Sequence, residues 1–281
     1  MSKIKNNNFI VSIGLPIHNG EFFLKTRIDS ILNQTFKNFE LIISDNASTD
    51  QTRKICEEYA KQDSRIQYIR QKKNIGGLQN FKFVLQNAKG KYFVWAAVDD
   101  FWKPTFLSKN IEILESNTNI IGSISEFDFF GKYADRYNLK STPHVVPFSG
   151  NYFDKCRLAL RISDTMIYGV YLLDLVKKSI PEVIGDGMIF MLSILKFGDF
   201  FVHDEILMYR SADGISSRGR ISMLRASNVS NWGIIFMHAP LMKWSIKHLG
   251  WKFIFANLDS YIRIFLVGYG RVILDILRNL R

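Results

Sequence analysis

Residues 91–100 read Lys-Tyr-Phe-Val-Trp-Ala-Ala-Val-Asp-Asp, an apolar run that ends on two adjacent carboxylates and is followed by Phe-Trp-Lys-Pro104. A run rich in Val, Tyr, Phe and Trp suits a strand covered on both faces, and Pro104 suits the first turn of a following helix. Asp99 and Asp100 repel each other, and a divalent cation or a pair of sugar hydroxyls would relieve that repulsion. The stretch predicts a buried strand that ends in a binding site, with an acidic turn or helix cap as the alternative.

Three strand–helix units are predicted upstream of this strand. The expected strands are 9–15, 39–44 and 66–70, and the expected helices are 21–34, 50–62 and one ending near residue 88. This alternation predicts an α/β fold with a doubly wound, mostly parallel sheet, whose ligands bind beyond the carboxyl ends of the strands. The polar stretches 16–20, 45–50 and 99–100 are therefore expected around one cleft.

Several of these polar residues have a purely structural alternative. Asp45 is also the residue type that closes an Asx-turn, and residues 74–77 also suit a flexible loop. Neither a Walker A loop nor a GxGxxG fingerprint occurs in the chain.

The pattern continues beyond Pro104. We expect a helix to about residue 116, strands at 120–126, 167–172 and 206–210, and a helix over 187–197 that begins after Asp186. Asp186 would also serve as a plain N-cap. The irregular, aromatic segment 127–150 is the expected carrier of substrate specificity.

Composition indicates a folded protein with a sizeable core. Of 281 residues, 47% are hydrophobic and 22% are charged, which allows one large domain or two. Cys56 and Cys156 have no metal-type or disulfide-type spacing, so a reduced, cytosolic compartment is expected. The first eight residues show no signal-peptide pattern.

The basic charge is concentrated at the C-terminal end. Residues 216–281 contain ten Lys and Arg and two acids, so they carry +8 of the net charge of +11. An amphipathic helix is predicted over 251–281, and Asp259 and Arg263 interrupt it too early for a membrane span of about 20 apolar residues. Basic residues interleaved with Trp, Phe, Ile and Leu favour an anionic membrane surface over nucleic acid. Packing on the catalytic domain, or self-association through this tail, is the alternative.

Four motifs in order carry a family resemblance: PIHNG at 16–20, DNASTD at 45–50, NIGGLQNF at 74–81 and WAAVDD at 95–100. Together they resemble the nucleotide-sugar half of family 2 glycosyltransferases, and the resemblance extends over residues 9–215. It implies a GT-A fold with a nucleotide-sugar-binding half at 9–100 and an acceptor half at 101–215. It also implies Mn²⁺ or Mg²⁺ as cofactor.

The resemblance assigns roles to individual residues. Asp45 is expected to bind the base, Asp99 the ribose or sugar, and Asp100 the metal, while Asp186 is the expected general base. The remaining expected nucleotide-binding residues are Pro16, which shapes the base pocket, together with His18, Asn19, Asn74 and Gly77. The sequence departs from the family where His18 replaces a usual Tyr and Val98 replaces a frequent first Asp.

The expected function is inverting transfer of a sugar from a nucleotide-diphospho sugar, a UDP-sugar, to a hydroxyl of a glycan or lipid-linked acceptor. The expected setting is bacterial-type surface polysaccharide synthesis on the cytoplasmic face of the membrane.

Two alternatives come from other classes. A sugar nucleotidyltransferase commonly has an N-terminal Gly-rich phosphate loop, which residues 16–20 do not supply. A membrane-bound scaffold without turnover would bind nucleotide sugar but transfer nothing.

Overall fold

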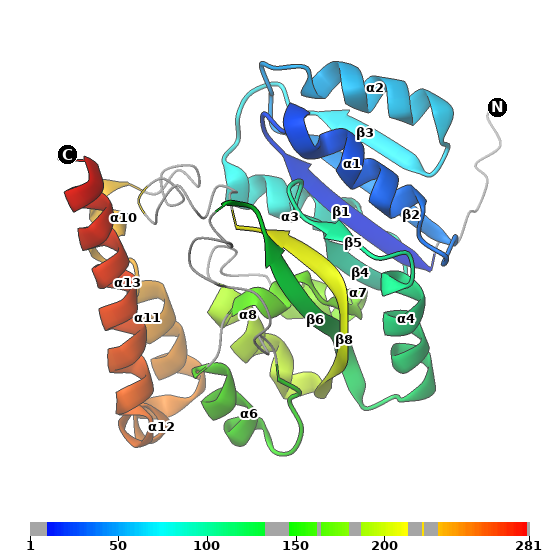
Figure 1. Cartoon of the computed structure of the whole chain (residues 1–281). Helices are drawn as coiled ribbons and strands as arrows, with labels where there is room; N and C mark the ends of the chain where they lie inside the picture. The colour runs from blue at the N-terminus through cyan, green and yellow to red at the C-terminus, as the bar shows by residue number, and fades with distance from the viewer. Residues whose placement is uncertain are drawn as a thin grey trace.

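The computed structural model describes residues 10–132, 146–161, 164–179, 187–212, 221 and 230–279. One eight-stranded sheet runs through the molecule in the order β3-β2-β1-β4-β7-β6-β8-β5. In the view of Figure 1, α1 crosses in front of the sheet and α3 lies behind it, while a group of C-terminal helices stands at the left edge. The fold is therefore α/β, as predicted.

The first half of the sheet is parallel, as the strand–helix alternation predicts. Its strands are β1 (Val11–Ile17), β2 (Phe39–Asp45), β3 (Ile66–Arg70) and β4 (Tyr92–Trp95), and its helices are α1 (Glu21–Leu32), α2 (Thr52–Gln62) and α3 (Gly77–Asn87). β1 pairs in parallel with both β2 and β4, and β2 pairs in parallel with β3. The strand order changes direction at β1, which is where ligands bind in sheets of this kind.

Two strand ends differ from their predicted positions. β1 continues through Pro16, which lies opposite Ser44, and ends at Ile17. β4 ends at Trp95. The next residue, Ala96, still donates its N–H to the Gly14 carbonyl at 2.8 Å, and the chain then turns away from the sheet. A short turn therefore separates the acid pair from the strand that leads to it.

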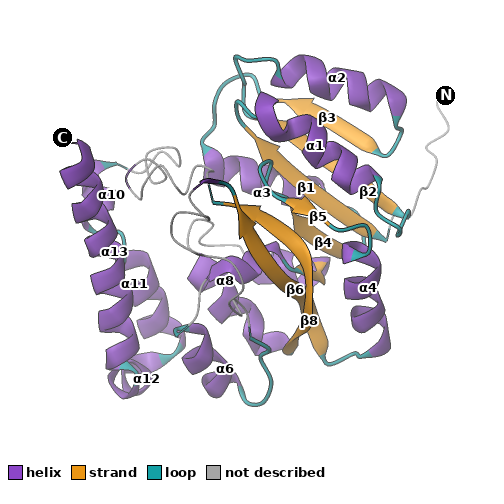
Figure 2. Ribbon diagram, viewed as in Figure 1, coloured by secondary structure: helices purple, strands orange, loops and turns teal. Residues whose placement is uncertain are grey.

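The second half of the sheet is mixed. Its elements are β5 (Phe101–Trp102), α4 (Phe106–Ser116), β6 (Ile120–Phe130), α6 (Tyr152–Ala159), η1 (Asp164–Tyr168), β7 (Val170–Leu172), α7 (Leu173–Ser179), α8 (Gly187–Ile194), η2 (Leu195–Phe197) and β8 (Asp199–Ser211). β7 is antiparallel to β4 and β6, and β5 is antiparallel to β8, whereas β6 and β8 are parallel. Figure 2 shows β6 and β8 as the two long, curved strands at the centre of this half.

Several predictions for this half were wrong in detail. Residues 127–130 belong to β6, because β8 extends from Asp199 to Ser211 and pairs with them. Residues 167–168 lie in the 3₁₀ helix η1, so only 170–172 form a strand. The helix predicted over 187–197 is α8 followed by the 3₁₀ turn η2. Asp186 lies outside the described residues.

The described residues from 230 to 279 form four helices: α10 (Asn231–Ile235), α11 (Ala239–His248), α12 (Gly250–Ala256) and α13 (Leu258–Asn279). The single helix predicted over 251–281 is interrupted at Asn257. The Asn257 side chain donates to the Phe253 carbonyl at 2.8 Å and accepts from Arg157 Nε of α6 at 3.1 Å. These bonds fix the break against α6.

These helices share the hydrophobic core of the sheet domain. Leu241, Trp244, Phe253 and Tyr261 are buried in the same cluster as the strands, and Arg263 donates to the Leu160 carbonyl at 3.0 Å. The tail therefore packs on the catalytic domain, one of the alternatives left open by the sequence.

The outer side of α13 is apolar. Its buried positions include Ser260, Tyr261 and Asp275. Its exposed apolar side chains are Leu258, Ile262, Leu266, Val267, Ile273, Leu274, Ile276 and Leu277. An ordinary surface helix turns its apolar stripe toward the core. α13 packs Tyr261 and Ile264 against the core, and it also exposes these eight apolar side chains. Among the described helices, none is long and apolar enough to cross a membrane.

Candidate active site

The predicted cleft residues lie at one edge of the sheet, where β1, β2 and β4 end. Ile17, the last residue of β1, pairs with Asp45, the last residue of β2. The turn that contains Asp99 and Asp100 follows β4, which is the other neighbour of β1. Parallel pairing therefore brings the three predicted polar stretches to a common edge.

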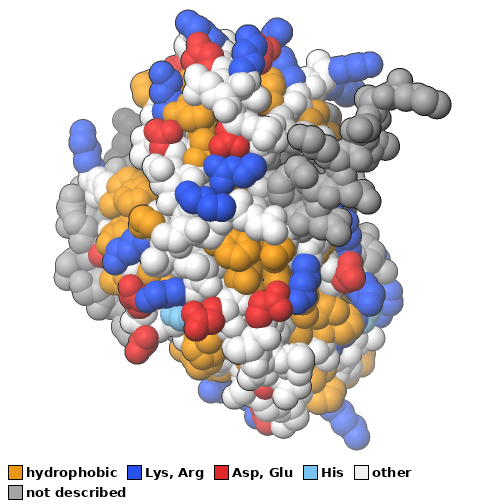
Figure 3. Space-filling model, turned by 90° about the vertical axis from the view of Figure 1, so that its right-hand side faces the viewer, with side chains coloured by type: hydrophobic (Ala, Val, Ile, Leu, Met, Phe, Trp, Pro, Cys, Tyr) orange, Lys and Arg blue, Asp and Glu red, His pale blue; other side chains and the backbone are white. Residues whose placement is uncertain are grey.

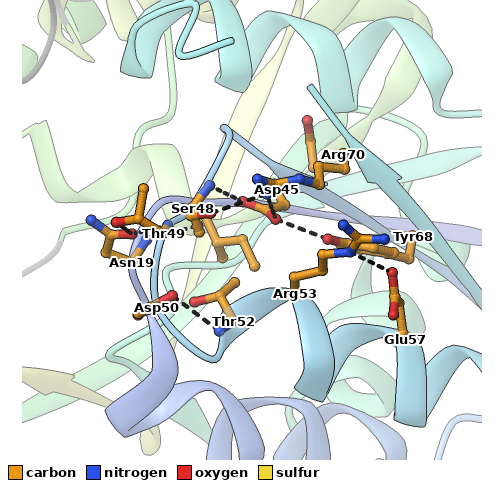
Figure 4. Close-up of polar contacts among 12 residues, drawn as sticks. Asn19, Asp45, Ser48, Thr49, Asp50, Thr52, Arg53, Glu57, Tyr68 and Arg70 are labelled. Carbon is orange, nitrogen blue, oxygen red and sulfur yellow. Dashed lines mark hydrogen bonds and ion pairs between the residues drawn. The ribbon is translucent and has the colours of Figure 1, made fainter. Parts of the chain in front are cut away.

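Asp45 is fully buried and binds three partners (Figure 4). Its Oδ1 accepts from the Ser48 N–H at 2.8 Å, and its Oδ2 accepts from Tyr68 Oη at 2.8 Å and from Arg70 Nη1 at 3.0 Å. Burial, and then the hydrogen bond to Asp45, raise the pKa of Tyr68, which keeps this phenol a proton donor. Asp45 thus closes the turn after β2 and joins it to β3, while its contact with a base stays a prediction.

Asn19 locks the loop after β1 onto the loop after β2. Its backbone has φ = 52°, a left-handed conformation that Asn tolerates better than most residues. Its N–H donates to Ser48 Oγ at 2.9 Å, and its side-chain oxygen accepts from the Thr49 N–H at 2.9 Å. The next residue, Gly20, donates its N–H to Thr52 Oγ1 at 2.9 Å. These bonds give Asn19 a structural role at the edge where we predict the nucleotide.

Asn74 connects a third loop to the same edge. Its Oδ1 accepts from Asn46 Nδ2 at 2.9 Å and from the Gly76 N–H at 2.8 Å, and its Nδ2 lies 3.4 Å from His18 Nε2. Gly76 has φ = 84°, which glycine adopts without strain, and Gly77 begins α3. The structure thus brings together His18, Asn19, Asp45 and Asn74, and it leaves the His18 ring exposed.

Pro16 lies within β1, whereas the sequence predicts it just after the end of that strand. It is half-buried inside β1, with Ser44 of β2 as its neighbour in the sheet. It therefore supports the strand end, and its contact with a base stays a prediction.

The two acids of the pair have different surroundings. Asp100 is 5% exposed, and its Oδ1 accepts from the Ser211 N–H at 3.0 Å while its Oδ2 lies 3.4 Å from Arg210 Nε. Asp99 is half-buried, and no hydrogen bond or ion pair joins its carboxylate to another of the described residues. Burial, and then the charge of Asp100, raise the pKa of Asp99 to about 6. Asp100 thus ties its turn to the end of β8, and Asp99 keeps its oxygens available.

Two arginines flank the acids, and the sequence analysis assigned a role to neither. Arg210 of β8 lies 4.9 Å from the centre of the Tyr168 ring and pairs with Asp100. Arg27 of α1 is buried, and its guanidinium carbon lies 4.0 Å above the Trp102 ring. The sequence does indicate that Arg27 is buried, because it shares the apolar side of its helix with Leu24, Ile28 and Ile31.

The acid pair suits a metal ion that is held jointly by the protein and a bound substrate. Among the described residues, no group of three or more His, Cys, Asp or Glu could hold a metal ion. Mg²⁺ is usually held by one or two carboxylates together with substrate phosphates and water. Asp99 and Asp100 supply that number of carboxylates beside the predicted nucleotide edge. A metal site completed by a diphosphate is therefore compatible with these residues.

Comparison with known proteins identifies the family. The sequence profile of Glycosyl transferase family 2 matches residues 12–196. The chain belongs to glycosyltransferase family 2. The sheet described above agrees with the GT-A-like fold of this family.

Curated relatives match part of the chain. A putative glycosyltransferase of Bacillus subtilis, EpsE, is 38% identical over 125 residues, which are 43% of this chain and 45% of EpsE. The putative teichuronic acid biosynthesis glycosyltransferase TuaG of the same organism is 33% identical over 105 residues, 37% of this chain and 42% of TuaG. An uncharacterized glycosyltransferase of Haemophilus influenzae is 37% identical over 111 residues, 40% of this chain and 34% of that protein. The matches thus span less than half of each relative.

Solved structures share the fold. Staphylococcus aureus TarS, residues 1–349, in complex with UDP-GlcNAc, matches with a TM-score of 0.60 and 16% identity, over 73% of this chain and 59% of TarS. A mannosyltransferase of Pyrobaculum calidifontis, in complex with GDP-Man and Mn²⁺, matches with a TM-score of 0.55 and 12% identity, over 98% of this chain and 82% of that chain.

Proposed function

We propose that this glycosyltransferase inverts the anomeric carbon and moves a sugar from a UDP-sugar to a hydroxyl of a glycan or lipid-linked acceptor. The printed name of TuaG, a putative teichuronic acid biosynthesis glycosyltransferase, favours a role in bacterial surface polysaccharide synthesis. The carrying observation is the common edge at which Asp45, the His18–Asn74 contact and the acid pair follow neighbouring strands. The two structural neighbours bind different nucleotides, so the choice of UDP rests on the resemblance at Asp45.

In the proposed mechanism, Asp45 recognises the base, and Asp186 removes the proton of the acceptor hydroxyl. That hydroxyl attacks the anomeric carbon in line as the nucleoside diphosphate leaves. Because Asp45 already accepts hydrogen bonds from Tyr68 and Arg70, its orientation is set before the donor arrives. A bound Mn²⁺ or Mg²⁺ would stabilise the negative charge on the diphosphate leaving group.

We further propose that Asp99 is the principal metal ligand of the pair, whereas the sequence analysis assigned the metal to Asp100. Asp100 already has the Ser211 N–H and Arg210 as partners. Asp99 is the more accessible carboxylate, and it shares a cavity with Asp100. In this view Asp100 fixes the turn on which Asp99 stands.

Titration calorimetry with UDP tests the donor site directly. We expect the wild-type protein to bind UDP in Mn²⁺ and to lose most of that binding in EDTA. Asp99→Asn should bind UDP equally weakly in Mn²⁺ and in EDTA, because the variant lacks the charged ligand. Asp204→Asn, a change of an exposed acid on β8, is the matched control and should behave like the wild type. Equal UDP affinity in Mn²⁺ and in EDTA for the wild-type protein would refute a metal-dependent donor site.

We also propose that the protein attaches peripherally to the cytoplasmic face of the membrane through the outer side of α13. The exposed apolar stripe from Leu258 to Leu277 supplies burial in lipid. Lys243, Lys252, Arg263 and Arg271 of the same helical group supply charges that suit anionic lipid. An acceptor linked to lipid would then be presented close to the enzyme, and self-association through this face is the competing account.

A further inference from the structure

Arg27 is a buried cation without a direct anionic partner. It lies on α1 and is 1% exposed, and no described carboxylate is within ion-pair distance of it. Its Nη1 makes one long hydrogen bond to Ser30 Oγ at 3.4 Å, while its Nε and Nη2 have no partner. Burying an unpaired charge is costly, so this position calls for a compensating group nearby.

The compensating groups are the two acids. Arg27, Asp99 and Asp100 line one cavity of about 90 Å³, together with Phe101 and Phe130. Burial lowers the pKa of Arg27 to about 10, and the charges of Asp100 and Asp99 oppose that effect. Arg27 therefore stays charged at neutral pH. Its charge interacts with the two carboxylates electrostatically across the cavity, without a direct hydrogen bond or ion pair.

Arg27 is also held in place. Its guanidinium stacks over Trp102, whose ring stacks on Phe106 with centroids 4.5 Å apart. Just beyond the end of α1, Gln34 donates to the Lys103 carbonyl at 2.8 Å and accepts from the Leu107 N–H at 3.0 Å. These contacts join α1 and the residues just after it to the segment that follows the acids, and they hold the guanidinium beside the acid pair.

We propose that Arg27 is a positioning residue for the metal: a fixed countercharge that keeps affinity for a free divalent cation low and makes tight metal binding depend on the donor diphosphate. This inference rests on the proposed donor site. Asp99 and Asp100 carry two negative charges, and Arg27 and Arg210 carry two positive ones, so the cluster is neutral. A metal ion that arrives alone meets no net attraction. The diphosphate supplies the missing negative charge.

The direction of the expected effect separates this role from a structural one. Removing the positive charge of Arg27 leaves the cluster negative, so affinity for free Mn²⁺ should rise. If Arg27 only supported the shape of the acid turn, its removal would lower that affinity or leave it unchanged. The dependence of Mn²⁺ affinity on UDP should fall, because part of the attraction is then already present in the protein.

The test is electron paramagnetic resonance of free Mn²⁺ during titration, with and without UDP. Arg27→Met should bind Mn²⁺ without UDP at least about tenfold more tightly than the wild type, and UDP should improve its affinity less. Arg27→Lys, which keeps the charge, should resemble the wild type. Arg53→Met removes an exposed charge on α2, where Arg53 pairs with Glu57, and should change little. Thermal unfolding verifies that each variant is folded, and Arg27→Gln replaces Arg27→Met if the latter does not fold.

The inference is overturned by unchanged or weaker Mn²⁺ affinity in a folded, neutral Arg27 variant, when the wild type binds Mn²⁺ more tightly with UDP than without it. Failure of the proposed donor site has a different signature, because the wild type would then bind Mn²⁺ equally with and without UDP, or would bind neither.

Discussion

The buried carboxylate of Asp45 has two roles: it closes the turn after β2, and it is the predicted partner of the base. Tyr68→Phe removes one of its donors and should lower the free energy of unfolding by about 1 kcal/mol, with UDP binding retained. Asp45→Asn weakens the bonds from Ser48, Tyr68 and Arg70 together, so it should cost about 2–3 kcal/mol and weaken UDP binding as well. Urea unfolding and calorimetry measure the two effects, and an Asp45→Asn protein with full UDP affinity would remove Asp45 from the base site.

At the residue scale, motif residues were predictable and their partners were not. Asp45, Asn74 and Asp99 follow predicted strands, so parallel pairing alone brings them to one edge. Arg70, Arg27 and Arg210 form the surroundings of these acids, yet they come from β3, α1 and β8. Their roles depend on tertiary packing between distant segments, which a local pattern does not encode. The division of labour between Asp99 and Asp100 depends on the Ser211 N–H for the same reason.

At the element scale, the parallel half of the sheet followed from alternating strand and helix patterns. The mixed half was harder, because β7 has only three residues and is defined by antiparallel pairing with β4 and β6. The long β8 was predicted only at 206–210, since His203, Asp204 and Glu205 interrupt the apolar pattern between its first residues and Ile206. The break at Asn257 depends on Arg157 of α6, a contact that periodicity does not reveal.

Close packing at Gly122 provides a test of this mixed half. A Cβ at Gly122 would lie 2.5 Å from the rings of Tyr171 on β7 and Phe200 on β8. Gly122→Ala should therefore lower the free energy of unfolding by about 1–3 kcal/mol. Gly270→Ala is the matched control, because nothing lies within 4 Å of its added Cβ in helix α13, and it should stabilise the protein by up to about 1 kcal/mol. Urea unfolding of both variants gives the comparison, and a neutral Gly122→Ala would mean that β6, β7 and β8 pack less closely than described.

At the scale of the whole molecule, the chain has two dissimilar sides. The side turned away from α13 displays acidic, basic and hydrophobic side chains that are interspersed, as Figure 3 shows. The outer side of α13 instead displays Leu258, Ile262 and Leu266. Removing residues 216–281 would strip Trp244 and Tyr261 from the core, so truncation is a poor test of membrane attachment. Substitutions on the exposed stripe leave the core intact.

Sedimentation with anionic liposomes tests the proposed membrane face. The double variant Ile262→Gln with Leu266→Gln should reduce pelleting by about tenfold or more, because each buried Ile or Leu contributes roughly 1.5–3 kcal/mol. Phe22→Gln, which removes from α1 an apolar side chain more exposed than Ile262 or Leu266, should pellet like the wild type. Added salt should weaken binding only in part, because the apolar contribution is not screened. Equal pelleting of the double variant and the wild type would favour self-association as the account of α13.

The central claim is that Asp186 is the general base of transfer from a nucleotide sugar. The most direct measurement is nucleoside diphosphate release from UDP-sugars in Mn²⁺, with a membrane glycolipid extract as acceptor. The wild type should turn over, and Asp186→Asn should lose roughly 10²–10⁴-fold in rate while still binding UDP, as expected when a general base is removed. Asp174→Asn, which changes an exposed acid on α7, should retain activity. Near-wild-type turnover by Asp186→Asn, or absence of release by the wild type from every UDP-sugar, would contradict the account.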